Sequence, residues 1–322
     1  MGVVVAGVGY VGAKLVDDLL AAGNGVVGID NFSATSPAAI RHLQRCPGFR
    51  FVRGSILNAR VLREALKAVG EIQCVYHLAA QASAHPEAAT PRYTENTNLI
   101  GARLLFEEAA AAGARKIVFA SSLRVYGPAL GGRVTEETPY GRFQDLSHLS
   151  KCYAEKLLEM IAHLRGLPAV SVRLGVVYGL SPVMKTDFAH MTVPNKFCLQ
   201  AAREEALRVH PLARGAIGFI HASDASAALR AAAEHEWGQT YLAANAAGEL
   251  CSVSALAARV RDLADARGLN VEVEDSVGAN DAAATVASRL DEAGFHPRRS
   301  LADGLGEVID YFVSQRRGGR RR

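Results

Sequence analysis

Short apolar runs alternate with helix-like apolar periodicity along the first half of the chain. Runs rich in Val, Ile and Phe predict strands at residues 3–6, 26–29, 51–52, 74–78, 116–120 and 169–174. Between them, apolar residues recur at helical spacing, which predicts helices over residues 11–22, 36–45, 61–69, 94–112 and 147–164. Strands that are apolar throughout are typical of a parallel sheet covered by helices on both faces.

This alternation predicts an α/β chain with a doubly wound parallel sheet, the Rossmann fold, because crossovers between parallel strands are right-handed. After residue 175 the pattern loosens, and residues 180–215 and 237–285 predict only shorter elements. We therefore expect a Rossmann domain over residues 1–175, to which some later segments return. A smaller C-terminal substrate lobe should make up most of residues 176–315, followed by a basic tail over residues 316–322.

The turn after the first predicted strand has the spacing G-x-G-x-x-G, formed by Gly7, Gly9 and Gly12. The first glycine permits a tight turn, the second lets the backbone approach a pyrophosphate, and the third lets the helix pack on the strand. The helix begins here, so the backbone N–H groups of Tyr10, Val11 and Gly12 are expected to face the phosphates of a dinucleotide.

The second predicted strand ends at Asp30, which is followed by Asn31. A carboxylate there accepts hydrogen bonds from the hydroxyls of the adenosine ribose and repels a 2′-phosphate. The sequence therefore predicts NAD, and not NADP, as the cofactor. The alternative is that Asp30 only caps the next element.

Composition and charge narrow the class of protein. The 322 residues are 49% hydrophobic, which is enough for a substantial core, and no apolar run is long enough to span a membrane. Five cysteines are scattered without C-x-x-C spacing, which favours reduced thiols in a cytoplasmic protein over disulfides or a metal site.

The basic character of the chain is local to its C-terminal tail. The formal net charge is +4, and the rest of the chain carries −1 once the five arginines of the tail are removed. Such a tail can contact nucleic acid, but we prefer to interpret it as a solvated terminus and expect no nucleic-acid partner.

Several further motifs are arranged in the order of a known family. These are H-L-A-A-Q-A-S at residues 77–83, N-x-x-G at 98–101, S-S-L-R-V-Y-G at 121–127, R-L-G-V-V-Y-G at 173–179 and a helix pattern over 294–312. The chain resembles an extended short-chain dehydrogenase/reductase of the NAD-dependent epimerase/dehydratase family. The resemblance covers almost the whole chain. It implies a small-molecule substrate, such as a nucleotide sugar, and a homodimer formed through the helices near 94–112 and 147–164.

The resemblance also assigns cofactor-side residues. It places Leu78, Ala79 and Ala80 beside the cofactor, and Ser55 and Ile56 near its adenine. Ser55 stands where the family often has an acidic residue.

The catalytic pair of the family is a Tyr and a Lys four residues apart on one helix, so both lie on the same face. The Tyr takes the hydroxyl proton during hydride transfer, and a Ser or Thr holds the substrate oxygen. Here Lys151 matches the Lys, which also contacts the cofactor, and Ser122 matches the Ser or Thr. The Tyr position is Ser147, which has no accessible pKa.

Four interpretations of Ser147 stay open. Another group, His148 or Tyr140, replaces the Tyr; His148 is attractive because histidine titrates near working pH. The substrate or a water carries the proton. The protein binds NAD without chemistry, as a sensor or scaffold. The register of the helix is shifted and the alignment is wrong.

The substrate side also departs from the family. Ile217 stands where family members that bind nucleotide sugars carry an Arg, although Arg214 is close by. Asn195 and Lys196 resemble a substrate-lobe segment that contacts phosphate, with a plain helix start as the alternative, and we assign Ser83 to the substrate side.

The position of Arg124 excludes one reaction. Leu123 and Arg124 replace the acidic pair of the 4,6-dehydratases, so we predict no such dehydration. A guanidinium there suits an anionic substrate, or it points away and pairs with Glu136 or Glu137.

Taken together, the sequence predicts an NAD-dependent epimerase or oxidoreductase that acts by hydride transfer on a hydroxyl-bearing small molecule. The competing hypothesis is a non-catalytic, or non-redox, NAD-binding protein of the same fold.

Overall fold

The computed structural model describes residues 2–83, 85, 89–143, 145–278 and 283–319. Within them, a seven-stranded sheet has the order β3-β2-β1-β4-β5-β7-β11, with every neighbouring pair parallel. Its strands are β1 (Gly2–Ala6), β2 (Gly25–Asp30), β3 (Phe49–Arg53), β4 (Ile72–His77), β5 (Ile117–Ser122), β7 (Ala169–Leu174) and β11 (Tyr241–Ala246). This order confirms the predicted Rossmann-like α/β fold.

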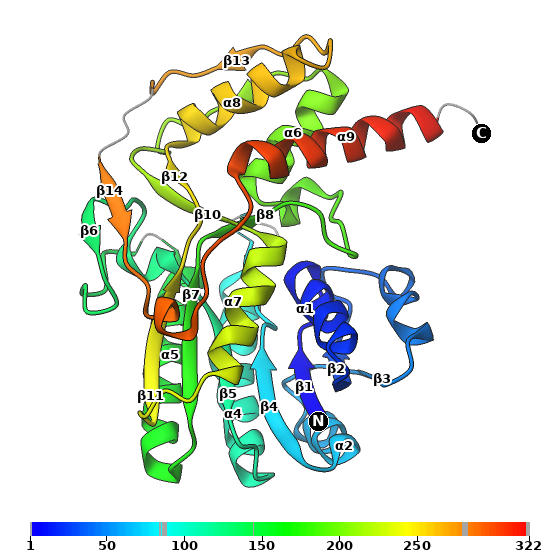
Figure 1. Cartoon of the computed structure of the whole chain (residues 1–322), viewed down its shortest axis with the longest axis vertical. Helices are drawn as coiled ribbons and strands as arrows, with labels where there is room; N and C mark the ends of the chain where they lie inside the picture. Colours follow the sequence, from blue (N-terminus) through cyan, green and yellow to red (C-terminus); the bar gives the residue numbers. More distant parts are fainter. Residues whose placement is uncertain (1, 84, 86–88, 144, 279–282, 320–322) are drawn as a thin grey trace.

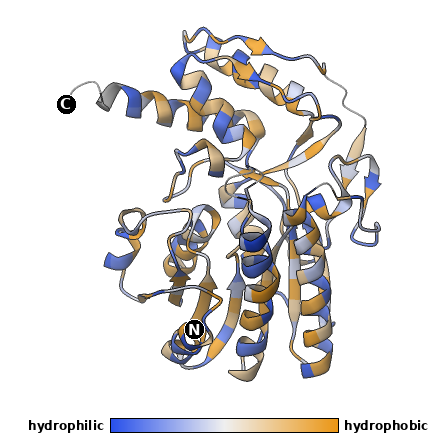
Figure 2. Cartoon of the chain, turned by 180° about the vertical axis from the view of Figure 1, so that it is seen from behind, coloured by the Kyte–Doolittle hydropathy of each residue, from blue (hydrophilic) through white to orange (hydrophobic). Residues whose placement is uncertain are grey.

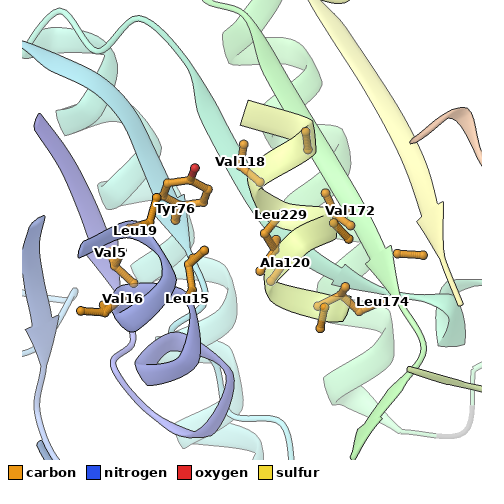
Figure 3. Packing of buried hydrophobic residues seen from close by; sticks show 14 of the residues in the cluster. Val5, Leu15, Val16, Leu19, Tyr76, Val118, Ala120, Val172, Leu174 and Leu229 are labelled. Atoms are coloured by element: carbon orange, nitrogen blue, oxygen red, sulfur yellow. The ribbon is translucent and has the colours of Figure 1, made fainter. Parts of the chain in front are cut away.

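Helices cover both faces of the sheet, and each face buries its own apolar cluster. One face packs against α1 (Tyr10–Ala21) and α7 (Ala222–Glu234), and the other against α2 (Ala59–Val69), α4 (Ala102–Ala111) and α5 (Leu146–Arg165). Figure 3 shows part of the first cluster, where side chains of β1, β4, β5 and β7 pack against α1 and α7. Figure 2 shows that the strands are mainly hydrophobic, whereas the helices carry both kinds of residue. Two-sided burial explains why the strand sequences are continuously apolar.

Two helix predictions need correction. Residues 36–45 were expected to form one helix, but they form two 3₁₀ turns, η1 (Pro37–Ile40) and η2 (Leu43–Arg45). Only Ile40 and Leu43 of this segment are buried, which is too little apolar surface to hold a full α-helix. The helix expected over 94–112 starts earlier, as α3 (Pro91–Thr94), and passes through a π-helical stretch, η3 (Glu95–Gly101), before α4.

The second half of the chain builds a separate layer above the carboxyl ends of the strands (Figure 1). Its core lies between α6 (Val193–Arg203), α8 (Val253–Asp265) and α9 (Leu301–Gly319) and the three-stranded sheet β12-β10-β8. The strands of that sheet are β8 (Val176–Tyr178), β10 (Ile217–His221) and β12 (Leu250–Cys251). Two parallel pairs complete the layer: β9 (Leu207–Arg208) with β13 (Val273–Glu274), and β6 (Gly132–Val134) with β14 (Ala284–Val286).

Short 3₁₀ turns connect several of these elements. They are η4 (Leu123–Tyr126), η5 (Phe188–His190) and η6 (Arg289–Ala293). Although β11 and α7 come late in the chain, they return to the main sheet, where β11 pairs with β7. The sheet therefore ends on a strand that lies within the residues expected to form mainly the substrate lobe.

The start of the basic tail is structured, contrary to our interpretation of residues 316–322 as a solvated terminus. Helix α9 continues to Gly319, and Arg316 donates hydrogen bonds to the Glu204 carboxylate at 2.8 Å and to the Ala202 carbonyl at 3.0 Å. The last three arginines of the tail lie outside the described residues. Across the described part of the chain, no helix combines the length and apolar character needed to cross a bilayer.

Candidate active site

The glycine turn after β1 has the shape that a dinucleotide needs. Gly7 has a φ of +96°, and a Cβ on Gly12 would lie 1.9 Å from the Gly7 carbonyl oxygen, so both positions require glycine. A Cβ on Gly9 would meet nothing closer than Thr35 at 3.9 Å, so the space above Gly9 is open. Helix α1 begins directly after Gly9, and no side chain caps its N-terminus. The residues present therefore fit the pyrophosphate of NAD.

The backbone N–H of Tyr10 is expected to face the pyrophosphate, whereas its side chain makes hydrogen bonds inside the protein. Its hydroxyl donates to the Gly179 carbonyl at 2.6 Å and accepts from Asn195 Nδ2 at 2.9 Å, and burial raises the pKa of Tyr10. This side chain ties α1 to the end of β8. Val11 is half-buried beside it, packed against the sheet cluster.

At the end of β2, the carboxylate of Asp30 accepts a hydrogen bond from the Phe32 backbone N–H at 2.7 Å. Burial raises the pKa of Asp30, and Lys185 from the loop after β8 opposes this shift. The sequence did not single out Lys185, because only the fold brings it to Asp30. Asn31 is exposed, and its Oδ1 accepts from the Ser33 backbone N–H at 3.0 Å.

The other predicted cofactor-side residues line the carboxyl edge of β3 and β4. Leu78 and Ala79 donate backbone hydrogen bonds to the Ala6 carbonyl at 2.8 and 2.7 Å, which holds the chain after β4 against the glycine turn. Ser55 accepts from the Leu57 backbone N–H at 3.2 Å, and Ile56 is buried. Ala80 is half-buried just beyond.

Lys151 and Ser122 both lie along the carboxyl-terminal half of β5. The Lys151 ammonium donates to the Ala120 carbonyl at 2.7 Å and lies 4.7 Å from the centre of the Phe119 ring. Burial lowers the pKa of Lys151 from 10.5 to about 8, although Glu155 opposes the shift. Ser122 is the last residue of β5, and its Oγ accepts from the Arg124 backbone N–H at 3.2 Å.

The Ser147 hydroxyl is already engaged. It donates to the Gln81 carbonyl at 3.1 Å, within a network in which Asn98 bridges Gln81 and Ser150. Ser150 in turn donates to the Ser147 carbonyl at 2.6 Å. Serine at this position therefore joins α5 to the chain after β4 and presents no group that titrates near neutral pH.

The neighbouring His148 forms a dyad with Asp145. Asp145 caps α5, accepting the His148 backbone N–H at 2.9 Å, and its second oxygen lies 2.5 Å from His148 Nδ1. Burial alone would raise the pKa of Asp145, but the bond to His148 and the nearby Arg124 lower it overall. Among the described residues, none forms a hydrogen bond with His148 Nε2.

Tyr140, the second candidate for the missing tyrosine, belongs to a buried ionic cluster. Its hydroxyl donates to Glu155 at 3.0 Å, and Glu155 pairs with Arg173 at 2.7 Å. Burial and Glu155 together raise the pKa of Tyr140. A phenol that donates to a buried carboxylate is a poor proton acceptor.

On the substrate side, the structure separates two neighbours in the sequence. Both ends of the Asn195 amide are used inside the protein, by Gly179 N–H at 3.1 Å and by Tyr10. Lys196 instead lines an open groove with Arg208, His210 and Asp275, which the sequence did not indicate. The Ser83 hydroxyl donates to the Ala189 carbonyl, so it fastens the loop after β8 to the loop after β4.

The alternative interpretation of Arg124, an ion pair with Glu136 or Glu137, is wrong. Glu137 pairs with Arg289, and Glu136 accepts the backbone N–H groups of Asn245 and Arg289, each at 2.8 Å. Arg124 lines a pocket beside Ser122.

The fold and the site define a dinucleotide-binding α/β protein with a second layer over the cofactor edge. The sequence model described as "NAD dependent epimerase/dehydratase family" matches residues 3–245. The chain therefore belongs to this family, and NAD is the family's cofactor, which confirms both expectations.

Two curated relatives and a solved structure illustrate the similarity. A UDP-glucose 4-epimerase of Mycolicibacterium smegmatis is 32% identical over 172 residues, covering 53% of this chain and 54% of that protein. UDP-glucuronic acid decarboxylase 2 of Arabidopsis thaliana is 29% identical over 320 residues, covering 96% of this chain and 67% of that protein. The match thus spans about half the length of the first relative and two thirds of the second. The UDP-glucose 4-epimerase of Thermotoga maritima shares the fold, with a TM-score of 0.82 at 22% identity over 98% of this chain and 99% of that chain.

Proposed function

We propose that this protein is an NAD-dependent enzyme, an epimerase or oxidoreductase, that acts on a hydroxyl-bearing carbon of a sugar nucleotide. One observation carries the proposal. Lys151 bonds to the Ala120 carbonyl of β5 and Ser122 ends the same strand, in the same fold whose glycine turn is open to a pyrophosphate. Bound NAD would supply the acceptor for a hydride from the substrate carbon.

The residues of the site take the following roles in this proposal. The backbone of Gly9–Gly12 binds the pyrophosphate, Asp30 binds the adenosine ribose, and Lys151 binds the nicotinamide ribose. Ser122 holds the hydroxyl oxygen of the substrate in place. We also propose that residues 1–175 bind mainly the cofactor and that residues 176–315 bind mainly the substrate, as the sequence predicts.

His148 is our choice for the group that moves the proton. The hydroxyl proton passes to His148 Nε2 as the hydride leaves the same carbon, and it returns when the hydride does. Asp145 orients the ring through Nδ1 and stabilises the imidazolium, as carboxylates do beside catalytic histidines. His148 directly follows Ser147, which stands at the position of the family's catalytic Tyr, and it lies about one helical turn before Lys151.

The groove beside Lys196 supports a nucleotide as the rest of the substrate. It places the ammonium of Lys196 and the imidazole of His210 beside Arg208, whose guanidinium pairs with Glu274 at 2.8 Å, and so offers one cation and a flat ring to a diphosphate and a base. The curated relatives above are named for UDP-sugars, UDP-glucose and UDP-glucuronic acid.

Two measurements test this function. Denatured, freshly purified protein should release NAD or NADH, and the protein should reduce bound NAD when UDP-sugars are added. His148→Asn should lower turnover by about 10²–10⁴-fold with NAD content unchanged. The control is His296→Asn, because His296 is exposed and lies 3.4 Å from Asp291 near η6. Full activity of His148→Asn would show that another group moves the proton.

The engaged Ser147 hydroxyl favours a second candidate, a non-catalytic NAD-binding protein. It predicts that NAD binds but that no hydroxyl substrate reduces it, and that Ser147→Tyr gains nothing. A gain of turnover in Ser147→Tyr would exclude it.

We further propose a homodimer formed through the outer face of α5. Leu149, Tyr153, Met160 and Leu164 share one exposed stripe there, and Ile100 of η3 is exposed nearby in the adjoining helix. Large apolar side chains gathered on one face mark protein interfaces. Met160→Arg should halve the mass measured by light scattering, whereas Leu212→Arg, at an exposed leucine far along the chain, should leave it unchanged.

A further inference from the structure

A narrow pocket lies directly beside Ser122 and joins the two layers of the protein. Its lining includes Ser122, Leu123 and Arg124 together with Leu174, Val176 and Ile217. Ser122 and Leu174 end β5 and β7 of the main sheet, whereas Val176 and Ile217 belong to β8 and β10 of the upper layer. If Ser122 holds the reacting hydroxyl of a substrate, the substituents on the neighbouring carbons therefore face this pocket.

The pocket is small. It leaves about 10 Å³ for the centre of a water-sized group, which is close to the space that a single water occupies. The lining is mainly apolar, with Leu123, Leu130 and Ile217 among its members.

Arg124 supplies the only cationic side chain of this lining. Its Nη1 donates to the Pro128 carbonyl at 2.7 Å, and it forms no ion pair with any carboxylate of the described chain. Asp145 is the acidic group whose charge acts on it, but that carboxylate is bonded to His148. Arg124 is half-buried, and burial lowers its pKa.

The ion pair of Arg173 shows how the same fold treats a buried guanidinium elsewhere. Arg173 is enclosed and meets the carboxylate of Glu155 at 2.7 Å, with a further bond to the Tyr126 hydroxyl at 2.6 Å. A half-buried charge without such a partner is unfavourable, and an arriving anion removes that penalty. Arg124 therefore lacks, within the described residues, the carboxylate partner that Arg173 has.

We propose that Arg124 binds a carboxylate on the sugar, so that the substrate is a nucleotide-linked uronic acid or a similar acidic sugar. The proposal rests on the function proposed above and deepens it. Guanidinium pairs with carboxylate through two parallel hydrogen bonds, and Arg124 is the one cationic side chain in the lining beside Ser122. One guanidinium balances one negative charge, so a carboxylate fits better than a phosphate dianion.

The spacing of Ser122 and Arg124 adds a constraint on the substrate. They are two residues apart on one turn, and the Arg124 backbone N–H bonds to Ser122 Oγ. The reacting hydroxyl and the carboxylate must then sit on nearby carbons, as the C4 hydroxyl and the C6 carboxylate of a hexuronic acid do.

A pair of probes isolates this carboxylate. UDP-glucuronic acid and UDP-glucose differ only at C6, so calorimetric titration of the intact protein with each gives the contribution of that group. We expect the wild type to bind UDP-glucuronic acid at least about tenfold more tightly, a difference of about 1.4 kcal/mol. Equal affinities, or a preference for UDP-glucose, would overturn the proposal without any variant.

Variants then locate the preference. Arg124→Met should remove it while leaving NAD content and affinity for UDP-glucose unchanged, and Arg124→Lys should retain part of it because a lysine keeps the charge without the fork. Arg133→Met is the matched control, since Arg133 is exposed on β6. A preference that survives in Arg124→Met overturns the assignment of Arg124.

The same titrations separate failure of this inference from failure of the proposed function. Binding of both probes with equal affinity, together with released NAD, contradicts only the carboxylate assignment. Absence of binding by either sugar nucleotide contradicts the proposed function and this inference with it.

Discussion

The cofactor half and the reaction half of the site are built from different materials. At β1, α1 and β2, the surface for the cofactor is made by backbone, by the absence of side chains at Gly9 and by one carboxylate, Asp30. At β5 and the start of α5, it is made by side chains; there Ser147 stands at the position of the family's Tyr, and Arg124 at a position that is acidic in the 4,6-dehydratases. A surface made of backbone tolerates few residue types, whereas the residues of a surface made of side chains can be substituted without changing the fold.

The most severe test of this comparison adds a single methyl group to the glycine turn of the cofactor half. In Gly12→Ala the new Cβ would lie 1.9 Å from the Gly7 carbonyl oxygen, so α1 cannot pack on β1 as it does. We expect the free energy of unfolding to fall by more than about 4 kcal/mol, measured by urea unfolding. Gly131→Ala is the control, because a Cβ there meets nothing within 4 Å. Equal stability of the two variants would contradict the close-packed turn.

The reaction half depends instead on a buried ion pair beneath it. Glu155 is fully buried and binds Arg173, while Ser121 and Tyr140 donate to the same carboxylate. Glu155→Gln removes the charge and leaves the guanidinium unpaired, which should destabilise the fold by about 3–5 kcal/mol.

The control for this prediction is the exposed pair of Arg115 with Glu71. Their side chains are 64% and 65% exposed, so Glu71→Gln should change the free energy of unfolding by no more than about 1 kcal/mol. Similar losses in the two glutamine variants would show that the buried pair does not support the reaction half.

Lys151 lies where the two halves meet, and its titration sharpens the comparison. Its pKa is about 8 in the folded chain against 10.5 ordinarily, so between these values the unfolded chain binds more protons. Stability therefore increases with pH across this window, by up to about 3 kcal/mol. Below pH 8 the full penalty of the buried ammonium is present.

The measurement is the difference in unfolding free energy between the wild type and Lys151→Met from pH 7 to 10.5. Subtracting the variant removes the other titrating groups. The difference should move in favour of the wild type as pH rises; a flat difference means that the ammonium is well solvated in the fold.

The same contrast decides how much the sequence alone could predict. The parallel sheet, the glycine turn and Asp30 follow from local patterns, because continuous apolar strands and glycine spacing report directly on backbone geometry. The helix predicted over residues 36–45 does not form, because this segment has helical spacing but buries too little apolar surface.

Most of the remaining side-chain contacts could not be predicted in this way, since they join residues far apart in the chain. Asp145 and His148 are close in sequence, but the groove of Lys196 and Arg208 and the approach of Lys185 to Asp30 depend on how the upper layer folds back. The sequence motif shows that Ser147 differs from the family's Tyr, but it does not show that the Ser147 hydroxyl donates to the Gln81 carbonyl.

The smallest expected effect concerns the choice of cofactor at Asp30. Its carboxylate should favour NAD by repelling the 2′-phosphate of NADP, while Lys185 on the facing loop is a cation that a phosphate could reach. In Asp30→Asn the repulsion is lost and the ribose still finds a polar group, so the ratio of NAD to NADP affinity should fall by about tenfold, or about 1.4 kcal/mol. Titration of both cofactors measures this ratio, and Asp17→Asn on α1, at a carboxylate 3.7 Å from His42, is the control. An unchanged ratio in Asp30→Asn would mean that Asp30 only caps the turn after β2, through its bond to Phe32, and that the backbone alone recognises the dinucleotide.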